Sequence, residues 1–297
     1  MAAVSLAVLT RARDGARRAA VRRQLEAVAA GRSTHVVLDL DDQRLDIAGV
    51  VEQVTASLPP DDYGIQHLVV AFKNSRAADR VIERLSAKGV RDRVTAARIT
   101  GALRIHEATP WLGPLLYARD PAVADAAARA LGRIGGTRSA SALLLAIRRR
   151  GVSRRFVAEL ARAAPDLFVE VALQDRHRPP VGPALAIAAG LRRRHTAIGQ
   201  LMSLVQEGSR RERMIACRAL GWIGARTAIP VISEALADRD WKIKVSAAKA
   251  LGSLHATSAR PDLEALLVNR NPRVRTSAEQ ALRRLDRARR VEVVHGA

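Results

Sequence analysis

Seven histidines and one cysteine are the residues of this 297-residue chain that could bind a transition metal, and their spacing does not suit a metal site. A zinc site on a helix usually places two ligands about four residues apart on one face. No two histidines have that spacing, and no histidine lies near the cysteine in sequence. We therefore predict no metal and no cofactor. The residues concerned are His35, His67, His106, His177, His195, His255, His295 and Cys217.

Catalysis by a nucleophile or by paired carboxylates has no recognisable motif in the chain. We find no Ser-His-Asp arrangement, no glycine-rich phosphate loop and no pair of carboxylates at a catalytic spacing. Cys217 lies in the apolar stretch Met214–Cys217, where a small buried residue is the usual interpretation. The chain is predicted to have no catalytic residues and not to be an enzyme.

Positive charge is the most prominent chemical feature of the composition. The chain has 50 Lys and Arg against 29 Asp and Glu, a formal net charge of +21. Such a surface favours anionic partners, namely nucleic acid, acidic proteins or an anionic membrane surface, and a merely solvated basic surface is the other interpretation. Arginines cluster near the middle of the chain, and we predict that they bind a partner: Arg148, Arg149, Arg150, Arg154, Arg155, Arg192, Arg193, Arg194, Arg210, Arg211 and Arg213.

A repeat of about thirty residues must position these side chains. The tripeptide Ala-Leu-Gly occurs at residues 130–132, 219–221 and 250–252, and Ala-Leu-Arg follows at 281–283. Aligning the flanking residues gives seven units spaced 29 to 31 residues apart. The residues that mark the repeat are Gly101, Leu131, Gly132, Gly190, Leu220, Gly221, Leu251, Gly252 and Leu282.

Each unit is predicted to be a pair of helices. Asp120, Asp240 and Asn271 precede the first helices and suit the N-cap position, where a side-chain oxygen accepts from the backbone. We expect the tripeptide glycine to end the first helix, because helix C-termini commonly need a left-handed residue. A second helix starts near Thr-Ala-Ile-Pro at residues 227–230. One pair cannot bury its apolar face alone, whereas stacked pairs form a continuous core.

The pattern Asp-Pro-x-Val, Ala-Leu-Gly-x-Ile-Gly and Ala-x-Pro-x-Leu resembles HEAT repeats, in particular the short bacterial HEAT-like repeats named from phycobilin lyases. The resemblance implies a right-handed α-solenoid (superhelix) of about seven helix pairs with an irregular helical N-terminal cap. In such repeats the acidic residue at the helix start and the basic residue four positions on often pair between neighbours. Asp240 with Lys244, and Asn271 with Arg275, occupy those places.

The regions outside the array are assigned by composition. Residues 1–35 are predicted to form a basic helix that is either a simple amphipathic helix or a membrane-proximal segment, and residues 36–87 a helical cap. Short strands at 36–38 and 68–70 are the alternative within the cap. The array is placed at 88–290, a flexible tail at 291–297, and the protein in the cytoplasm, with membrane association through the N-terminus as the second option.

Two enzyme families with HEAT-like folds were weighed. The iron enzymes that hydroxylate deoxyhypusine carry several His-Glu dipeptides in register, whereas this chain has only His106-Glu107, so that interpretation fails. The glycosylases that act on alkylated purines use tryptophans and an aspartate in a basic groove. Candidates here are Trp111, Trp222 and Trp241, with Asp238 or Asp240.

The predicted function is therefore a non-catalytic scaffold that binds a protein partner through the solenoid surface, by analogy beside a membrane enzyme such as a glycosyltransferase. The alternative is a basic nucleic-acid-binding HEAT protein, including an activity like that of the alkylpurine DNA glycosylases.

Overall fold

The computed structural model describes residues 2–42, 44–59, 63–175 and 181–295. Within these ranges, it describes the side chains of residues 12 to 288. Across the described residues the fold consists of 17 α-helices and six short 3-10 turns, without a strand. The prediction of an all-α solenoid is confirmed. Residues 36–38 are irregular and residues 68–70 lie in a helix, so the alternative of short strands is wrong. The chain folds as two compact units, Met1–Ala146 and Ile147–Ala297.

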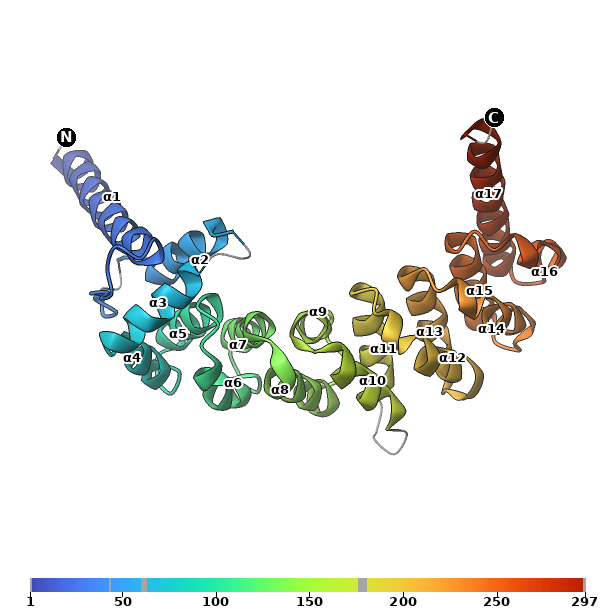
Figure 1. The fold of residues 1–297 in the computed structure, drawn as a ribbon, viewed down its shortest axis with the longest axis horizontal. Coiled ribbons are helices and arrows are strands. Elements are labelled where there is room, and N and C mark those ends of the chain that lie inside the picture. Colours follow the sequence, from blue (N-terminus) through green and yellow to red (C-terminus); the bar gives the residue numbers. More distant parts are fainter. Residues whose placement is uncertain (1, 43, 60–62, 176–180, 296–297) are drawn as a thin grey trace. The chain divides into compact units, whose positions relative to one another are not determined.

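The first unit begins with the helices that precede the array (Figure 1). Helix α1 packs against α2 and α3, α2 packs against α5, and α4 also packs against α5. Two helix pairs follow, α5 with α6 and α7 with α8, and α8 extends past the end of this unit. The bounds are α1 (Ala2–Ala29), α2 (Ile47–Ser57), α3 (Gly64–Asn74), α4 (Ala77–Arg84), α5 (Val90–Ala102), α6 (Thr109–Leu115), α7 (Pro121–Ile134) and α8 (Gly136–Arg150).

The second unit is a stack in which each first helix packs on the next: α9 on α11, α11 on α13, α13 on α15 and α15 on α17. The first helices are α9 (Arg154–Ala163), α11 (Gly182–Leu191), α13 (Arg210–Ile223), α15 (Trp241–Ser253) and α17 (Pro272–His295). The second helices are α10 (Asp166–Gln174), α12 (Ile198–Glu207), α14 (Ile229–Glu234) and α16 (Arg260–Ala265).

The last predicted repeat differs from a helix pair. Six phased units form pairs in the described chain, but the seventh consists of α17 alone, which runs on to His295. The helix therefore covers most of the segment 291–297 that was predicted to be a flexible tail. The start of the fourth unit, at residues 178–180, lies outside the described residues, as does His177.

The N-cap predictions are confirmed at three repeats. Carboxylate oxygens of Asp120 and Asp240 each accept a hydrogen bond at 2.8 Å from the backbone N–H two residues on. The Asn271 side chain accepts from the Arg273 amide at 2.9 Å. These contacts satisfy amide groups that have no partner within the helix. Asp240 also pairs with Arg210 of α13, so an ion pair joins these two neighbouring repeats.

The tripeptide glycine has a different role from the predicted one. Gly101, Gly190, Gly221 and Gly252 lie inside their helices, and each faces the alanine of the next tripeptide. A Cβ at Gly101 would lie 2.6 Å from the Cα of Ala130, and the corresponding distances at Gly190, Gly221 and Gly252 are 3.0, 3.0 and 2.8 Å. The glycines therefore allow successive first helices to pack backbone to backbone. The leucines of the three Ala-Leu-Gly tripeptides, Leu131, Leu220 and Leu251, are fully buried.

Each of the first six repeats has a buried residue at the position of the tripeptide leucine, which we call the phase residue: Thr100, Leu131, Leu160, Ala189, Leu220 and Leu251. The first helix of a repeat ends just before the position four residues after it. Gly135 and Gly224 occupy this position with φ of 73° and 84°. Arg104, Arg193 and His255 occupy the same position in other units with φ of 52°, 50° and 51°. A left-handed residue thus ends five of the first helices, and it is the second glycine of the motif that suits this conformation.

Within the described ranges, no helix combines the length and the apolar character that a bilayer span requires.

Candidate binding surface

The arginines predicted to bind a partner lie on four separate elements of the second unit. Arg148, Arg149 and Arg150 end α8, and Arg154 and Arg155 begin α9. Arg192 and Arg193 follow α11, and Arg210 and Arg211 begin α13. All nine are exposed.

Arg194 does not belong to an exposed surface, and its assignment to partner binding was wrong. Only 5% of it is exposed, and its guanidinium donates to the carbonyl oxygens of Ala161, Ala164 and Ala188. Its Nε also donates to Asp166 at 2.6 Å. Arg194 therefore ties the end of α9 to α10 and α11. The repeat register held a signal for this burial that the linear arginine cluster obscured, because Arg194 occupies the position of the buried Ile105, Ala225 and Ala256 in other units.

Arg213 is also engaged within the fold. It pairs with Asp238 at 2.5 Å, and its Nε donates to the Val205 carbonyl at 2.8 Å. Together with the Arg210 to Asp240 pair, it links α13 to the loop that leads into α15. These two arginines hold neighbouring repeats together and are less free for a partner than Arg211.

A groove of about 610 Å³ crosses the first helices α13, α15 and α17. Cationic side chains line it from all three helices, with two tryptophans between them. The residues are Met214, Arg218, Gly221, Trp222, Trp241, Lys242, Val245, Ser246, Lys249, Ala250, Ser253, Gln280 and Arg284. We call this region the α13–α15–α17 face, and it is the candidate binding surface.

Cations cover the aromatic rings of this face. The Arg218 guanidinium lies 5.1 Å from the ring centroid of Trp222. The Lys242 ammonium and the Arg273 guanidinium lie 5.5 Å and 5.1 Å from that of Trp241. Such contacts stabilise a cation over a ring while its outer side stays in water. Arg218, Lys242 and Arg273 are thus held in place by the two tryptophans.

The sequence contained a signal for this face that our site prediction did not use. The phase leucines of the last three repeats are Leu220, Leu251 and Leu282. Arg218, Lys249 and Gln280 stand two residues before them, and Trp222, Ser253 and Arg284 stand two residues after them. These positions follow the repeat and not the linear arginine clusters, and a helix surface is built from residues at repeat spacing.

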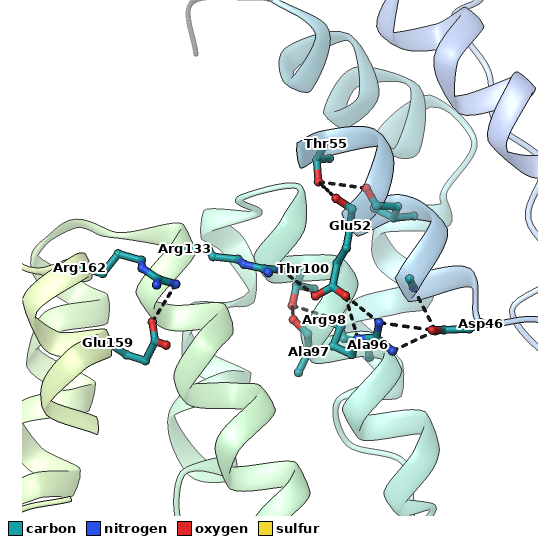
Figure 2. A network of polar contacts seen from close by, with 12 residues as sticks. Asp46, Glu52, Thr55, Ala96, Ala97, Arg98, Thr100, Arg133, Glu159 and Arg162 are labelled. Carbon is teal, nitrogen blue, oxygen red and sulfur yellow. Dashed lines mark hydrogen bonds and ion pairs between the residues drawn. The ribbon is translucent and has the colours of Figure 1, made fainter. Parts of the chain in front are cut away.

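In the first unit, arginines at the same repeat positions bind a carboxylate of the N-terminal cap. Figure 2 shows Arg98 of α5 and Arg133 of α7 converging on Glu52 of α2. Arg98 donates to Glu52 Oε2 at 2.6 Å, and Arg133 to Glu52 Oε1 at 2.7 Å. Arg98 also donates to Asp46, at 2.9 Å. The acidic cap therefore neutralises the arginines at the start of the array.

The Glu52 carboxyl responds to this environment. Burial alone would raise its pKa, but hydrogen bonds from Arg98 and Arg133 and their positive charges bring the pKa below its usual value. A lowered folded-state pKa stabilises the fold above the pKa of the unfolded chain, and the stabilisation is lost as pH falls through the folded value.

We expect Glu52→Gln to destabilise the first unit by about 1 kcal/mol at neutral pH. The difference from wild type should shrink as the pH falls below about 4.3, the pKa of an unfolded glutamate. Urea unfolding at several pH values, with the exposed Glu83→Gln as control, measures this. A difference that stayed constant across the acidic range would contradict the ionic role of Glu52.

Cys217 is buried in α13, in agreement with its interpretation as a core residue. Burial raises the pKa of its thiol to about 12. The reactive thiolate is therefore scarce at neutral pH.

Native protein should accordingly react with a thiol reagent about a thousandfold more slowly than denatured protein. Absorbance of the released chromophore over time measures the rate. A native rate near that of the denatured chain would contradict the buried assignment.

Among the described residues, no group of three or more His, Cys, Asp or Glu side chains could hold a metal ion. Glu107 of the single His-Glu dipeptide pairs with Lys73 at 2.7 Å, and this contact lowers the pKa of its carboxyl.

Comparison with known proteins identifies the repeat. HEAT repeats match residues 198–283, and the PBS lyase HEAT-like repeat matches residues 123–148. No curated protein has a sequence that matches the chain. Among solved structures, human deoxyhypusine hydroxylase in complex with glycerol aligns over 81% of this chain and 96% of its own, at 19% identity and a TM-score of 0.38. An engineered protein aligns over 88% of this chain and 68% of its own, at 19% identity and a TM-score of 0.37. Likeness this distant carries no functional inference.

Proposed function

Because the chain is a HEAT-repeat protein, we propose that it is a non-catalytic scaffold that binds a partner protein through the surface of its stacked helices. HEAT repeats are generally protein-interaction modules, which supports a protein partner. The observation that carries the proposal is the α13–α15–α17 face, where exposed cations and two tryptophans line a groove across three successive repeats. An extended surface built from repeats is the form in which solenoids bind their partners.

A DNA glycosylase is less well supported by this geometry. Its candidate aspartates are engaged: Asp238 pairs with Arg213, and Asp240 caps α15 and pairs with Arg210. Burial alone would raise the pKa of Asp240, but the Lys242 amide and Arg210 lower it. Both carboxylates are therefore engaged within the fold and are not free to act on a nucleobase.

A location beside a membrane enzyme is the more specific version of the proposal. The exposed arginines Arg13, Arg18 and Arg23 of α1 would suit an anionic membrane surface. Membrane fractionation of the wild-type chain and of a variant with Arg13→Gln, Arg18→Gln and Arg23→Gln tests this, because these exposed side chains are not part of the packing of α1 on α2 and α3. Loss of membrane recovery in the variant would support it, and identical recovery would contradict it.

The scaffold proposal is tested by affinity purification of the tagged full chain from cells that express it, with nuclease treatment before elution. A specific protein should co-purify and should re-form a stoichiometric complex when both components are purified separately. Recovery of nucleic acid alone, abolished by nuclease, would contradict the proposal and favour the nucleic-acid alternative.

A further inference from the structure

Two pairs of cations occupy equivalent places in the two units. Arg98 of α5 and Arg133 of α7 stand two residues before and two residues after their phase residues. Lys249 of α15 and Arg284 of α17 stand at the same two positions. The helices of each pair are neighbours that pack together.

The backbones that carry the two pairs approach each other in the same way. A Cβ at Gly101 of α5 would lie 2.6 Å from the Cα of Ala130 in α7. A Cβ at Gly252 of α15 would lie 2.8 Å from the Cα of Ala281 in α17. Since the cations are borne at equal offsets from these contacts, Lys249 and Arg284 can converge on one carboxylate as Arg98 and Arg133 do on Glu52.

Arg284 is already oriented toward α15. Its Nη1 donates to the Ser253 hydroxyl oxygen at 2.9 Å, and that hydroxyl donates to the Lys249 carbonyl at 3.0 Å. Holding a long side chain in one place before binding reduces the entropy that binding must otherwise cost. The second pair is therefore partly preorganised.

The charge around the second pair is not balanced within the chain. In the first unit, α2 packs against α5 and supplies Glu52. In the second unit, α13 packs against α15 and supplies Arg218 and Trp222, neither of which is acidic. Among the side chains of the described residues, no carboxylate forms an ion pair with Lys249, Arg284 or Arg218. Glu52 thus neutralises the cation pair of the first unit, whereas the second unit exposes Arg218, Lys249 and Arg284 to solvent.

We propose that the α13–α15–α17 face binds an acidic segment of the partner protein, with one of its carboxylates held between Lys249 and Arg284. This inference rests on the proposed scaffold function and names the chemistry of its partner. Neighbouring carboxylates of the segment pair with Arg218 and Lys242 along the groove. Charge-assisted hydrogen bonds of this kind are short and stronger than neutral ones.

A protein carboxylate fits the face better than nucleic acid does. Binding of single-stranded nucleic acid relies on bases stacking on exposed aromatic rings. Here Arg218, Lys242 and Arg273 of the chain itself lie over the rings of Trp222 and Trp241. In the first unit, by contrast, two cations at these repeat positions bind a glutamate: Arg98 and Arg133 both donate to the Glu52 carboxylate.

The test uses the full chain and a fluorescently labelled helical peptide whose glutamates recur four residues apart. Fluorescence anisotropy at low ionic strength measures its affinity for wild type, for Lys249→Gln with Arg284→Gln, and for Arg226→Gln with Arg239→Gln. The control pair removes the same charge from exposed arginines outside the groove. We expect the first variant to bind about tenfold more weakly or worse, and the control to stay within about twofold.

A glutamine version of the peptide and a single-stranded DNA of matched charge complete the experiment. The glutamine peptide should not bind measurably, and the DNA should lose no more affinity with the Lys249 and Arg284 substitutions than with the control pair, since both remove two positive charges. Equal affinity of the two variants for the glutamate peptide, no binding of that peptide, or a DNA affinity that falls further with Lys249 and Arg284 than with the control pair would each overturn the proposal.

Folding of each variant is checked by its thermal unfolding. Lys249→Gln alone is the fallback, since the Lys249 side chain is exposed and forms no hydrogen bond or ion pair with the described residues. If a natural partner still co-purifies with the Lys249→Gln, Arg284→Gln variant as with wild type, this inference fails while the scaffold function stands. If no protein co-purifies with wild type, the scaffold function itself fails.

Discussion

Replacing Arg194 with methionine is expected to destabilise the second unit by about 3 kcal/mol, although arginine is the residue type most readily assigned to a surface. The substitution leaves the carbonyl oxygens of Ala161, Ala164 and Ala188 without their donor in a buried place. It also removes the ionic partner of Asp166. A buried acceptor that loses its partner keeps the full cost of its desolvation.

Urea unfolding followed by tryptophan fluorescence measures this effect, because Trp222 and Trp241 both lie in the second unit. Arg193→Met is the matched control, since Arg193 is the adjacent arginine and is exposed. We expect its effect to stay within about 0.5 kcal/mol. Equal midpoints for the two variants would contradict the structural role of Arg194.

Gly252→Leu is expected to destabilise the second unit by about 3 kcal/mol as well, even though leucine favours helix formation by roughly 1 kcal/mol over glycine. The new Cβ would lie 2.8 Å from the Cα of Ala281, which is backbone and cannot rotate away. Helices α15 and α17 would have to move apart, and the packing around the buried Leu251 and Leu285 would loosen.

Gly199→Leu serves as the control for this prediction. Gly199 also lies inside a helix, α12, but a Cβ there would meet no atom within 4 Å. Its substitution should leave stability unchanged or raise it by up to about 1 kcal/mol. If both substitutions shifted the unfolding midpoint equally, the close approach of α15 and α17 would not be the reason for the glycine.

The repeat could be predicted from the sequence because its residues recur in phase and each has a local physical role. Leu131, Leu220 and Leu251 are fully buried, whereas Leu282 in the last repeat is half-buried. Asp120 and Asp240 cap helices as their residue type suggests. These roles depend on neighbours close in sequence or one repeat away, and such relations are visible in the spacing.

The roles that were missed depend on contacts between helices. Gly221 and Gly252 could equally end a helix or admit a neighbour, and only the position of Ala250 and Ala281 decides between these roles. Arg194 looks like its exposed neighbours Arg192 and Arg193 in the sequence, but the carbonyls that it satisfies lie about thirty residues earlier.

The candidate surface was only partly predictable for a related reason. Linear clusters such as Arg148–Arg150 attract attention, whereas a solenoid surface is assembled from single residues at repeat spacing. Lys249 and Arg284 become a candidate pair once α15 and α17 are seen to pack as α5 and α7 do, and once Glu52 shows what the first pair binds.

Site-specific photocrosslinking from position 280 tests the central claim most directly. Gln280 is exposed and lines the groove with Lys249 and Arg284. A benzophenone amino acid at this position, in cells that express the full chain, should yield an adduct with one protein through a segment rich in Asp and Glu. The same group at Arg226, outside the groove, should not yield it. An adduct that forms equally from both positions, or one that forms only with nucleic acid, would contradict the account.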